Sequence, residues 1–377
     1  MRFFIKPVGS EKFPFKIPFS KCLILLLGLT IWQLVPRPAT GQTTKQFRLE
    51  EVFQEGTPVF RGIASDNENR LYFSNQKGSV KCLDYETKTI LWKTEVGGEI
   101  ISPFFPFEDR LFFLSKGSSE TAEKDGNLLN SISRKTGVTL WRKKLLGERN
   151  VIFPVLKNLF ATDPGSISGI STDDGQTIGK IEYEGGDLLV FEVKESGAVL
   201  AGNKRKELLI FPGDDGQLVR RPLKQNPTAF IQAGDGTYIW GDQSGNIGAF
   251  EKPEKPGVWR AKAGGEISSL TEVGENVLIT SLDNFAYLYS IKSGSLRWKK
   301  RLGERIVDPP LLVGKLAVFA FTNSELALFL EVEKGKMVDR ILLPEGLFFT
   351  GPPARIEGAL FFPTSSGLRV YREVSGE

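Results

Sequence analysis

The sequence predicts an all-β fold, an eight-bladed β-propeller in which each blade is a four-stranded antiparallel sheet. Two observations predict it: a short phrase recurs every 38 to 48 residues, and apolar residues alternate with polar ones inside each copy. A repeat of this length is typical of solenoids, propellers and arrays. Alternation with a period of two, interrupted by glycine-containing turns, is typical of short antiparallel strands.

Four copies of the phrase are clear, and each ends in a tryptophan followed by a basic residue. They span residues 78–93, 126–142, 245–260 and 284–299. In the first copy, residues 71–74, 78–83 and 89–93 are expected to form three consecutive strands, because each is an alternating segment bounded by turn formers. We therefore expect a meander of short strands in every copy.

The other four copies are weaker, and we locate them by requiring the same spacing between successive third strands. Eight third strands are expected to start at Gly78, Gly126, Gly165, Glu207, Gly245, Asn284, Ser324 and Gly367. The turn after five of these strands holds a glycine, at Gly137, Gly175, Gly216, Gly294 and Gly335. We expect two-residue hairpins there, in which glycine supplies a positive φ. Four residues after each glycine stand Trp141, Gly179, Arg220, Trp298 and Asp339.

The two ends of the repeat region predict how the ring closes. The last copy begins at Gly367 and stops before its fourth strand, whereas residues 47–53 alternate apolar and charged side chains without a blade of their own. Pairing residues 47–53 with residues 367–372 would complete the last blade and remove an open sheet edge. The long first interval holds a polar stretch, residues 117–125, which we expect to be an extended loop.

The first 41 residues are expected to be a signal peptide or an N-terminal anchor, and residues 42–377 a β-propeller domain. A basic flank precedes the uncharged run 22–35, which is short for a membrane span and is followed by small residues. A buried helix of the fold is the remaining alternative. Without residues 1–41 the chain has 43 basic and 44 acidic residues, which gives no support to nucleic-acid binding.

The two cysteines allow few roles. Cys22 starts the apolar run instead of following it, so a lipid-modified cysteine is not expected there. Cys82 would be the single cysteine of the exported protein, which leaves no intrachain disulfide. It occupies an alternating strand position and is expected to be a small buried side chain.

Phrases such as residues 126–142 and 290–299 resemble the quinoprotein-type, or PQQ-like, β-propeller repeat, with its glycine-started strand, Thr-Gly turn and closing tryptophan. The resemblance covers about residues 47–374. It implies that the tryptophan docks between neighbouring blades, a structural role that falls here on Trp92, Trp141, Trp259 and Trp298. Trp240 lies outside this register, in the preceding strand, and is expected to be a packing residue.

Among exported proteins with eight such blades, the chain resembles the BamB family, scaffold proteins of the outer-membrane barrel-assembly machinery. The resemblance implies a propeller that starts with an N-terminal strand and a location in the periplasm or cell envelope. Two departures from the family pattern are the missing lipid-attachment motif and four blades without tryptophan. No loop matches a family motif well enough to transfer partner-contact residues.

The residues give no catalytic constellation, so we expect no enzyme, no cofactor and no metal. The chain has no histidine, which excludes Ser-His-Asp, Cys-His and His-zinc sites within it. Calcium at the Asp-Gly segments 173–175, 214–216 and 235–236 is an alternative, but turns account for all three. No glycine pair is followed by a helical pattern that would hold a dinucleotide.

Three functions follow as hypotheses. The preferred one is a non-catalytic exported propeller, a monomer, that binds other proteins at the cell envelope as a scaffold, in outer-membrane protein assembly. It would bind no nucleic acid and would touch a membrane only through an N-terminal anchor. The alternative is a small-molecule or quinone (PQQ) binder, including a quinoprotein-type enzyme, which rests on fold analogy. A carbohydrate-binding or cell-surface module is the third.

Overall fold

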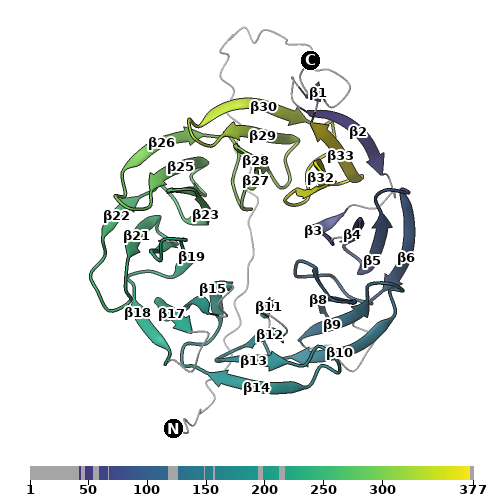
Figure 1. Cartoon of the computed structure of the whole chain (residues 1–377), viewed down its shortest axis with the longest axis horizontal. Coiled ribbons are helices and arrows are strands. Elements are labelled where there is room, and N and C mark those ends of the chain that lie inside the picture. Colours follow the sequence, from purple (N-terminus) through teal and green to yellow (C-terminus); the bar gives the residue numbers. More distant parts are fainter. Residues whose placement is uncertain are drawn as a thin grey trace, which may run out of the picture. The chain divides into compact units, whose positions relative to one another are not determined.

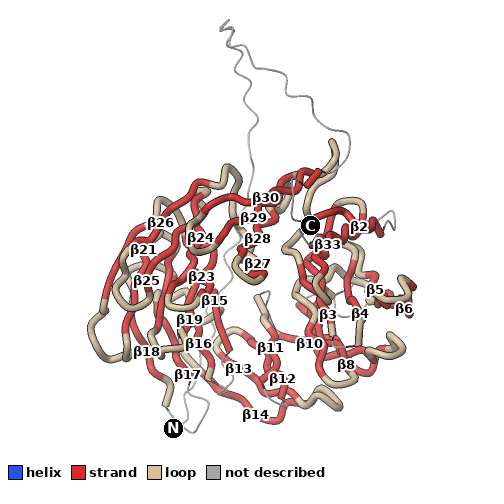
Figure 2. The backbone as a smooth tube through the Cα atoms, turned by 45° about the horizontal axis from the view of Figure 1, so that its top comes forward, coloured by secondary structure: helices blue, strands red, loops and turns tan. Residues whose placement is uncertain are grey.

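The structure is a computed structural model of the chain. It describes residues 42–43, 47–53, 59–66, 68–117, 126–147, 149–155, 158–193, 198–211 and 217–373. The described residues form strands and loops and contain no helix (Figure 2). The expected signal peptide or anchor, residues 1–41, lies outside the described residues, as do residues 118–125 of the expected polar loop.

The strands assemble into eight antiparallel sheets, which we number as blades 1 to 8 in chain order. Blade 1 comprises β3 (Phe60–Ser65), β4 (Arg70–Ser74), β5 (Ser79–Asp84) and β6 (Thr89–Glu95). Blade 2 comprises β7 (Phe105–Phe107), β8 (Arg110–Lys116), β9 (Asn127–Ser133) and β10 (Thr139–Leu145). Blade 3 comprises β11 (Ile152–Val155), β12 (Asn158–Asp163), β13 (Ser166–Ile170) and β14 (Thr177–Glu182). Blade 4 comprises β15 (Leu188–Val193), β16 (Val199–Asn203), β17 (Glu207–Phe211) and β18 (Val219–Pro222).

The second half of the chain continues the pattern. Blade 5 comprises β19 (Pro227–Gln232), β20 (Tyr238–Asp242), β21 (Asn246–Phe250) and β22 (Trp259–Lys262). Blade 6 comprises β23 (Ile267–Val273), β24 (Asn276–Ser281), β25 (Phe285–Ser290) and β26 (Leu296–Arg301). Blade 7 comprises β27 (Leu311–Val313), β28 (Leu316–Ala320), β29 (Leu326–Glu331) and β30 (Lys336–Leu342). Blade 8 comprises β31 (Ala354–Ile356), β32 (Ala359–Thr364), β33 (Gly367–Glu373) and, from the other end of the chain, β2 (Phe47–Phe53).

The blades follow one another around a closed ring (Figure 1). The fourth strands, such as β10, β14 and β26, form the outer rim, and the first strands lie nearest the axis. The predicted fold class is confirmed, with eight blades of four antiparallel strands. The eight predicted third strands correspond to β5, β9, β13, β17, β21, β25, β29 and β33, each within two residues of its expected start.

The predicted closure of the ring is also confirmed. β2 pairs with β33 in antiparallel register, from Phe47 opposite Glu373 to Phe53 opposite Leu368. Phe47 is 1% exposed, and its ring stacks on Phe329 of blade 7 at 4.6 Å between centroids. The last blade is therefore completed by the N-terminal part of the propeller, and β33 is paired on both sides instead of forming an open outer edge.

The start of the described chain makes a contact that the sequence pattern did not predict. β1 (Gln42–Thr43) pairs antiparallel with the outer strand of blade 7, with Gln42 opposite Leu342 and Thr43 opposite Ile341. Blade 7 therefore has a fifth strand. The chain crosses from the rim of blade 7 to the rim of blade 8 before the first complete blade begins.

The turns between third and fourth strands are longer than the predicted two residues. In blade 2 the Gly137 amide donates to the Ser133 carbonyl, and the Ser133 amide donates to the Val138 carbonyl, so these bonds enclose a loop of residues 134–137. Gly137 has φ of 71° and Gly294, at the same position in blade 6, has φ of 65°. The prediction of a positive-φ glycine is confirmed at Gly137, Gly175, Gly294 and Gly335, whereas Gly216 lies outside the described residues. The predicted two-residue length is wrong, because the glycine follows another turn residue instead of belonging to a two-residue turn.

The hydrophobic core lies between the blades. The buried apolar residues of the described chain form eight clusters, and each cluster draws its members from two neighbouring blades. A sheet of four short strands is too thin to bury apolar side chains on both of its faces. Each blade therefore depends on both neighbours, which is why the repeat requires a closed ring.

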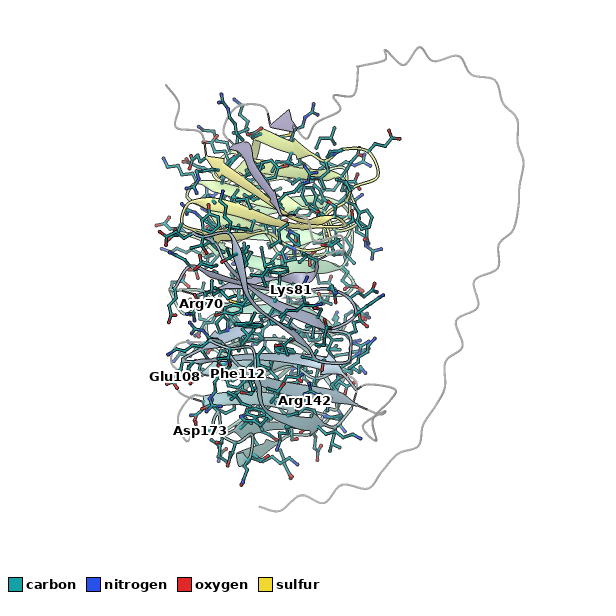
Figure 3. All side chains as sticks on the ribbon, turned by 90° about the vertical axis from the view of Figure 1, so that its right-hand side faces the viewer. Arg70, Lys81, Glu108, Phe112, Arg142 and Asp173 are labelled. Atoms are coloured by element: carbon teal, nitrogen blue, oxygen red, sulfur yellow. The ribbon has the colours of Figure 1, made fainter. Side chains whose placement is uncertain are left out.

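The two faces of the ring differ in their loops. The connector face carries the segments that join the fourth strand of one blade to the first strand of the next, and also the turns between second and third strands. The turn face carries the turns between first and second strands and, except in blade 8, those between third and fourth strands. Figure 3 shows Glu108 and Asp173, from turns of blades 2 and 3, at this same end of the ring.

Candidate functional site

The four tryptophans singled out in the sequence occupy equivalent positions on the outer strands of blades 1, 2, 5 and 6. Each indole N–H donates a hydrogen bond to a backbone carbonyl in the turn that precedes the fourth strand of the next blade. The bonds run from Trp92 to Arg134 (2.8 Å), Trp141 to Thr172 (2.9 Å), Trp259 to Ile291 (2.6 Å) and Trp298 to Val332 (2.8 Å). Each contact therefore joins two sheets that share no backbone ladder.

The glycine of each of these turns makes room for the indole. A Cβ atom on Gly294 would lie 2.4 Å from Cγ of Trp259, and one on Gly335 would lie 2.6 Å from Trp298. Gly137 and Gly175 have the same relation to Trp92 and Trp141. Positive φ and close approach of the ring thus both require glycine in this turn. That the contact stabilises the ring stays a prediction, which substitution of Trp259 tests.

The junction between blades 1 and 2 also contains a buried ion pair. Nη2 of Arg134 lies 2.6 Å from Oδ2 of Asp66, and the two side chains are 10% and 4% exposed. The Tyr72 hydroxyl donates to the same carboxylate oxygen at 2.6 Å. Burial opposes ionisation of Asp66, but the hydrogen bonds from Tyr72 and the Glu68 amide and the charge of Arg134 hold the pKa of its carboxyl below the usual value.

Blade 4 has no tryptophan, and an arginine makes the corresponding contact with the next blade. Nη1 of Arg221 donates to the carbonyls of Pro253 (2.6 Å) and Lys255 (2.7 Å), which lie in the turn of blade 5. The guanidinium carbon lies 4.1 Å from the centre of the Phe250 ring. Sequence reasoning missed this residue, because it looked for an aromatic side chain at the tryptophan spacing.

The strand register corrects which residue of blade 4 replaces the tryptophan. Counting four residues beyond the turn glycine in the sequence gives Arg220 as the replacement. In blades 1, 5 and 6 the tryptophan pairs with the third-strand residue that lies four positions after the positive-φ residue before this strand, as Trp259 does with Ala249. In blade 4 the positive-φ residue is Lys206, and the third-strand residue four positions after it pairs with Val219. Val219 therefore occupies the tryptophan position of this blade. Arg221 lies two residues further along the same face of the strand.

In blade 7 the residue at the tryptophan position is Asp339, which is 2% exposed and opposite Phe329. Its Oδ1 accepts the Arg340 amide at 2.8 Å. The next blade has no turn to receive an indole here, because its third and fourth strands come from opposite ends of the chain. The missing tryptophan of blade 7 thus has a geometric reason.

A pocket of about 400 Å³ lies at the junction of blades 4 and 5. It is lined by residues 221–224 of blade 4 and by parts of β20, β21 and β22 of blade 5. Trp240, which lies outside the repeat register, forms part of its wall. The sequence pattern predicted a packing role for Trp240 and gave no indication of a pocket, because the two walls come from different blades.

The aspartates considered for calcium serve their own turns where the structure describes them. Oδ1 of Asp174 accepts the Gln176 amide, and Oδ1 of Asp235 accepts the Thr237 amide. Asp173 pairs with Arg110 of blade 2 at 3.1 Å. Asp214 and Asp215 lie outside the described residues. Across the described part of the chain, no group of three or more His, Cys, Asp or Glu side chains is placed to hold a metal ion.

Cys82 is fully buried, opposite Trp92 in the blade 1 register. Burial raises the pKa of its thiol to about 12, so the reactive thiolate is scarce at neutral pH.

The described residues include no helix with the length and hydrophobicity needed to cross a bilayer.

The closed ring of eight meandering blades, built from a repeat that ends in an interblade tryptophan, defines a PQQ-like β-propeller. A family model described as "Outer membrane protein assembly factor BamB" matches residues 28–252 and 243–338. The chain therefore belongs to this family.

Two characterised proteins are similar in sequence. The outer membrane protein assembly factor BamB of Yersinia pestis is 26% identical over 176 residues, which cover 46% of this chain and 40% of that protein. A polyvinylalcohol dehydrogenase of a Pseudomonas species is 27% identical over 117 residues, 29% of this chain and 18% of that protein. The matches thus span two fifths or less of these relatives.

Solved structures share the fold at low identity. BamB from Moraxella catarrhalis has a TM-score of 0.64 at 14% identity and covers 88% of this chain and 99% of its own. Saccharomyces cerevisiae Sqt1 has a TM-score of 0.70 at 11% identity, with 89% and 100% covered. The computationally designed Ika8 protein has a TM-score of 0.68 at 13% identity, with 86% and 98% covered. At these identities the likeness concerns the fold.

Proposed function

We propose that this chain is an exported, non-catalytic scaffold that binds other proteins at the cell envelope in the course of outer-membrane protein assembly. The observation that carries the proposal is the family match, which extends over most of the propeller. The fold agrees with such a role, since a rigid ring held by interblade contacts presents loops without needing any chemistry of its own.

We further propose the connector face as the partner-binding face. Its segments are long, as in residues 302–310 between blades 6 and 7 and residues 343–353 between blades 7 and 8. They expose apolar side chains: Leu146 is 70% exposed, Val307 45% and Phe348 36%. Val307 and Phe348 lie in successive connectors. Exposed apolar side chains on adjacent loops favour a protein partner.

The experiment is affinity purification of the full chain from detergent-solubilised envelopes, with quantification of co-purified outer-membrane assembly proteins by mass spectrometry. The double variant Val307→Asp, Phe348→Asp should lose the partner. The matched control is Val138→Asp, which puts the same charge on an exposed valine of the turn face. Purification of the wild-type chain without any assembly protein would contradict the proposed function, and equal loss in both variants would contradict the choice of face.

The second candidate is a quinone-binding propeller, which the match to the polyvinylalcohol dehydrogenase favours. Titration with pyrroloquinoline quinone and calcium, followed by absorbance and thermal shift, distinguishes it from the scaffold. Saturable binding at micromolar quinone would favour this candidate. Unchanged melting up to millimolar quinone would exclude it.

A further inference from the structure

The pocket between blades 4 and 5 has an unusual wall on its blade 5 side. Trp240, Gly248 and Arg260 are directly opposite one another on three neighbouring strands, so their side chains share one face of the sheet. A Cβ atom on Gly248 would lie 2.7 Å from the indole, which shows that the ring lies over the glycine. The wall therefore presents a flat aromatic surface next to an exposed guanidinium.

The opposite wall brings a second guanidinium. Arg221 is held by the two carbonyls of the blade 5 turn and by the Phe250 ring, so its position is determined by its neighbours. Burial and, after it, the positive charge of Arg260 lower the pKa of Arg221, which indicates that the two guanidinium groups are close. Lys224 adds a third cation to the lining.

The pocket lacks the acidic groups that would neutralise these cations. Among the described residues, the guanidinium of Arg260 forms no ion pair and no hydrogen bond, and the guanidinium of Arg221 donates to carbonyl oxygens. The acidic residue in the lining is Asp242, whose carboxylate accepts the amides of Ser244 and Asn246 at 2.9 Å and the Asn246 side chain at 2.7 Å. The Asp242 carboxylate is therefore occupied by hydrogen bonds within its own turn. Three cations against one carboxylate leave the pocket with excess positive charge.

We propose that this pocket binds a phosphate group carried on a small organic moiety, such as the phosphoglycerol unit of a metabolite or of a lipid headgroup. Guanidinium groups bind oxyanions through paired N–H donors. A tetrahedral phosphate carries oxygens on several sides, so it can accept hydrogen bonds from donors on both walls at once. The indole of Trp240 supplies an apolar surface for the organic part. This proposal goes beyond the scaffold function and does not depend on it.

The test is calorimetric titration of the full chain with inorganic phosphate and with glycerol 3-phosphate at constant ionic strength. Both should bind saturably, and Arg260→Gln should weaken both at least tenfold. Trp240→Leu should weaken glycerol 3-phosphate more than inorganic phosphate. The matched control is Arg297→Gln, which removes one exposed arginine from the outer strand of blade 6 and should leave both affinities unchanged.

Flotation with vesicles of phosphatidylglycerol or of phosphatidylcholine distinguishes the two sources. Arg260-dependent binding to phosphatidylglycerol assigns the site to a lipid headgroup, and binding of glycerol 3-phosphate without vesicle binding assigns it to a soluble phosphate ester. Three results would overturn the proposal: no saturable binding of either phosphate, equal weakening by Arg260→Gln and Arg297→Gln, or a glutamate-rich peptide that binds more tightly than glycerol 3-phosphate and displaces it.

Discussion

Different side chains connect neighbouring blades at the junction of blades 5 and 6 and at the junction of blades 4 and 5. At the former, the Trp259 indole stacks on Tyr289, with an interplanar angle of 12°, and donates to a turn carbonyl. At the latter, Arg221 lies over Phe250 and donates to two turn carbonyls. Tyr289 and Phe250 are each the fifth residue of their third strand.

The comparison shows what the repeat requires at a junction. Both solutions place a planar N–H donor against an aromatic ring and the turn of the next blade. The indole is neutral and 9% exposed at Trp259, whereas the guanidinium of Arg221 brings a positive charge to its junction. We infer that the tryptophan junctions serve mainly to hold the ring together, and that the arginine junction adds the positive charge that an anion would bind.

The largest expected effect is that of Trp259→Ala, which should lower the free energy of unfolding by about 3–5 kcal/mol through loss of a buried ring. Urea denaturation followed by circular dichroism measures it. Trp259→Phe keeps a ring but removes the N–H donor, and should cost about 1–3 kcal/mol because the Ile291 carbonyl loses its partner. A cost below 1 kcal/mol for Trp259→Ala would contradict the docking role.

Next in size is Arg134→Met at the junction of blades 1 and 2, which should cost about 3 kcal/mol because Asp66 keeps a buried charge without its partner. Asp66→Asn with Arg134→Met in one chain should restore part of the loss. If the double variant is no more stable than the sum of the single changes predicts, the ion pair does not couple the two blades.

Acid should act on the same junction. Because the folded-state pKa of Asp66 lies below its unfolded value of about 3.9, its contribution to stability is complete above that pH and is lost as the pH falls through the lower, folded-state pKa. The urea midpoint of the wild-type chain, followed from pH 5 to pH 2.5, should therefore fall more steeply than that of Asp66→Asn. Parallel curves would contradict this assignment.

A smaller effect is expected for Arg221→Ala, about 1–2 kcal/mol, since the side chain is half-buried and water can reach the turn carbonyls that it leaves. Equilibrium denaturation checks the value beside Trp259→Ala under identical conditions. A cost equal to that of Trp259→Ala would mean that the two junctions are equally structural, and would remove the difference inferred above.

The smallest effect is local and is reported by Cys82. The thiol is buried with a raised pKa, so iodoacetamide at pH 8 should label the Cys82 peptide far more slowly in the native chain than in urea. Trp92→Phe should speed native labelling, because Trp92 lies directly opposite Cys82 and its loosening opens that junction. Peptide mass spectrometry separates Cys82 from Cys22, and an unchanged rate would show that the indole does not close the junction.

Much of the architecture could be predicted from the order of residues along the chain. The spacing of the glycines and tryptophans predicted eight third strands, the positive-φ glycines of the turns and the pairing of residues 47–53 with the last blade. The strands and turns are local features, since period-two alternation and turn chemistry act over a few residues. The closing pair is not local, but it follows from the repeat because the last copy lacks its fourth strand. The membership of the four tryptophans in one structural class was likewise readable, because each stands 14 or 15 residues after the first residue of the repeated phrase.

Other features arise only when distant blades meet. Nothing in the local pattern of residues 219–222 indicated that Arg221 would reach the turn around Pro253, or that Trp240 and Arg260 would share a wall with it. The fifth strand of blade 7 and the pairing of Asp66 with Arg134 belong to the same class. The amino-acid sequence by itself thus determined the repeat, its strands and the closed ring, because hydrogen-bonded ladders and turns are encoded within each forty-residue unit. The contacts between blades, and with them the candidate binding pocket, were decided by the tertiary structure, because packing brings together side chains whose positions depend on the register of two separate sheets.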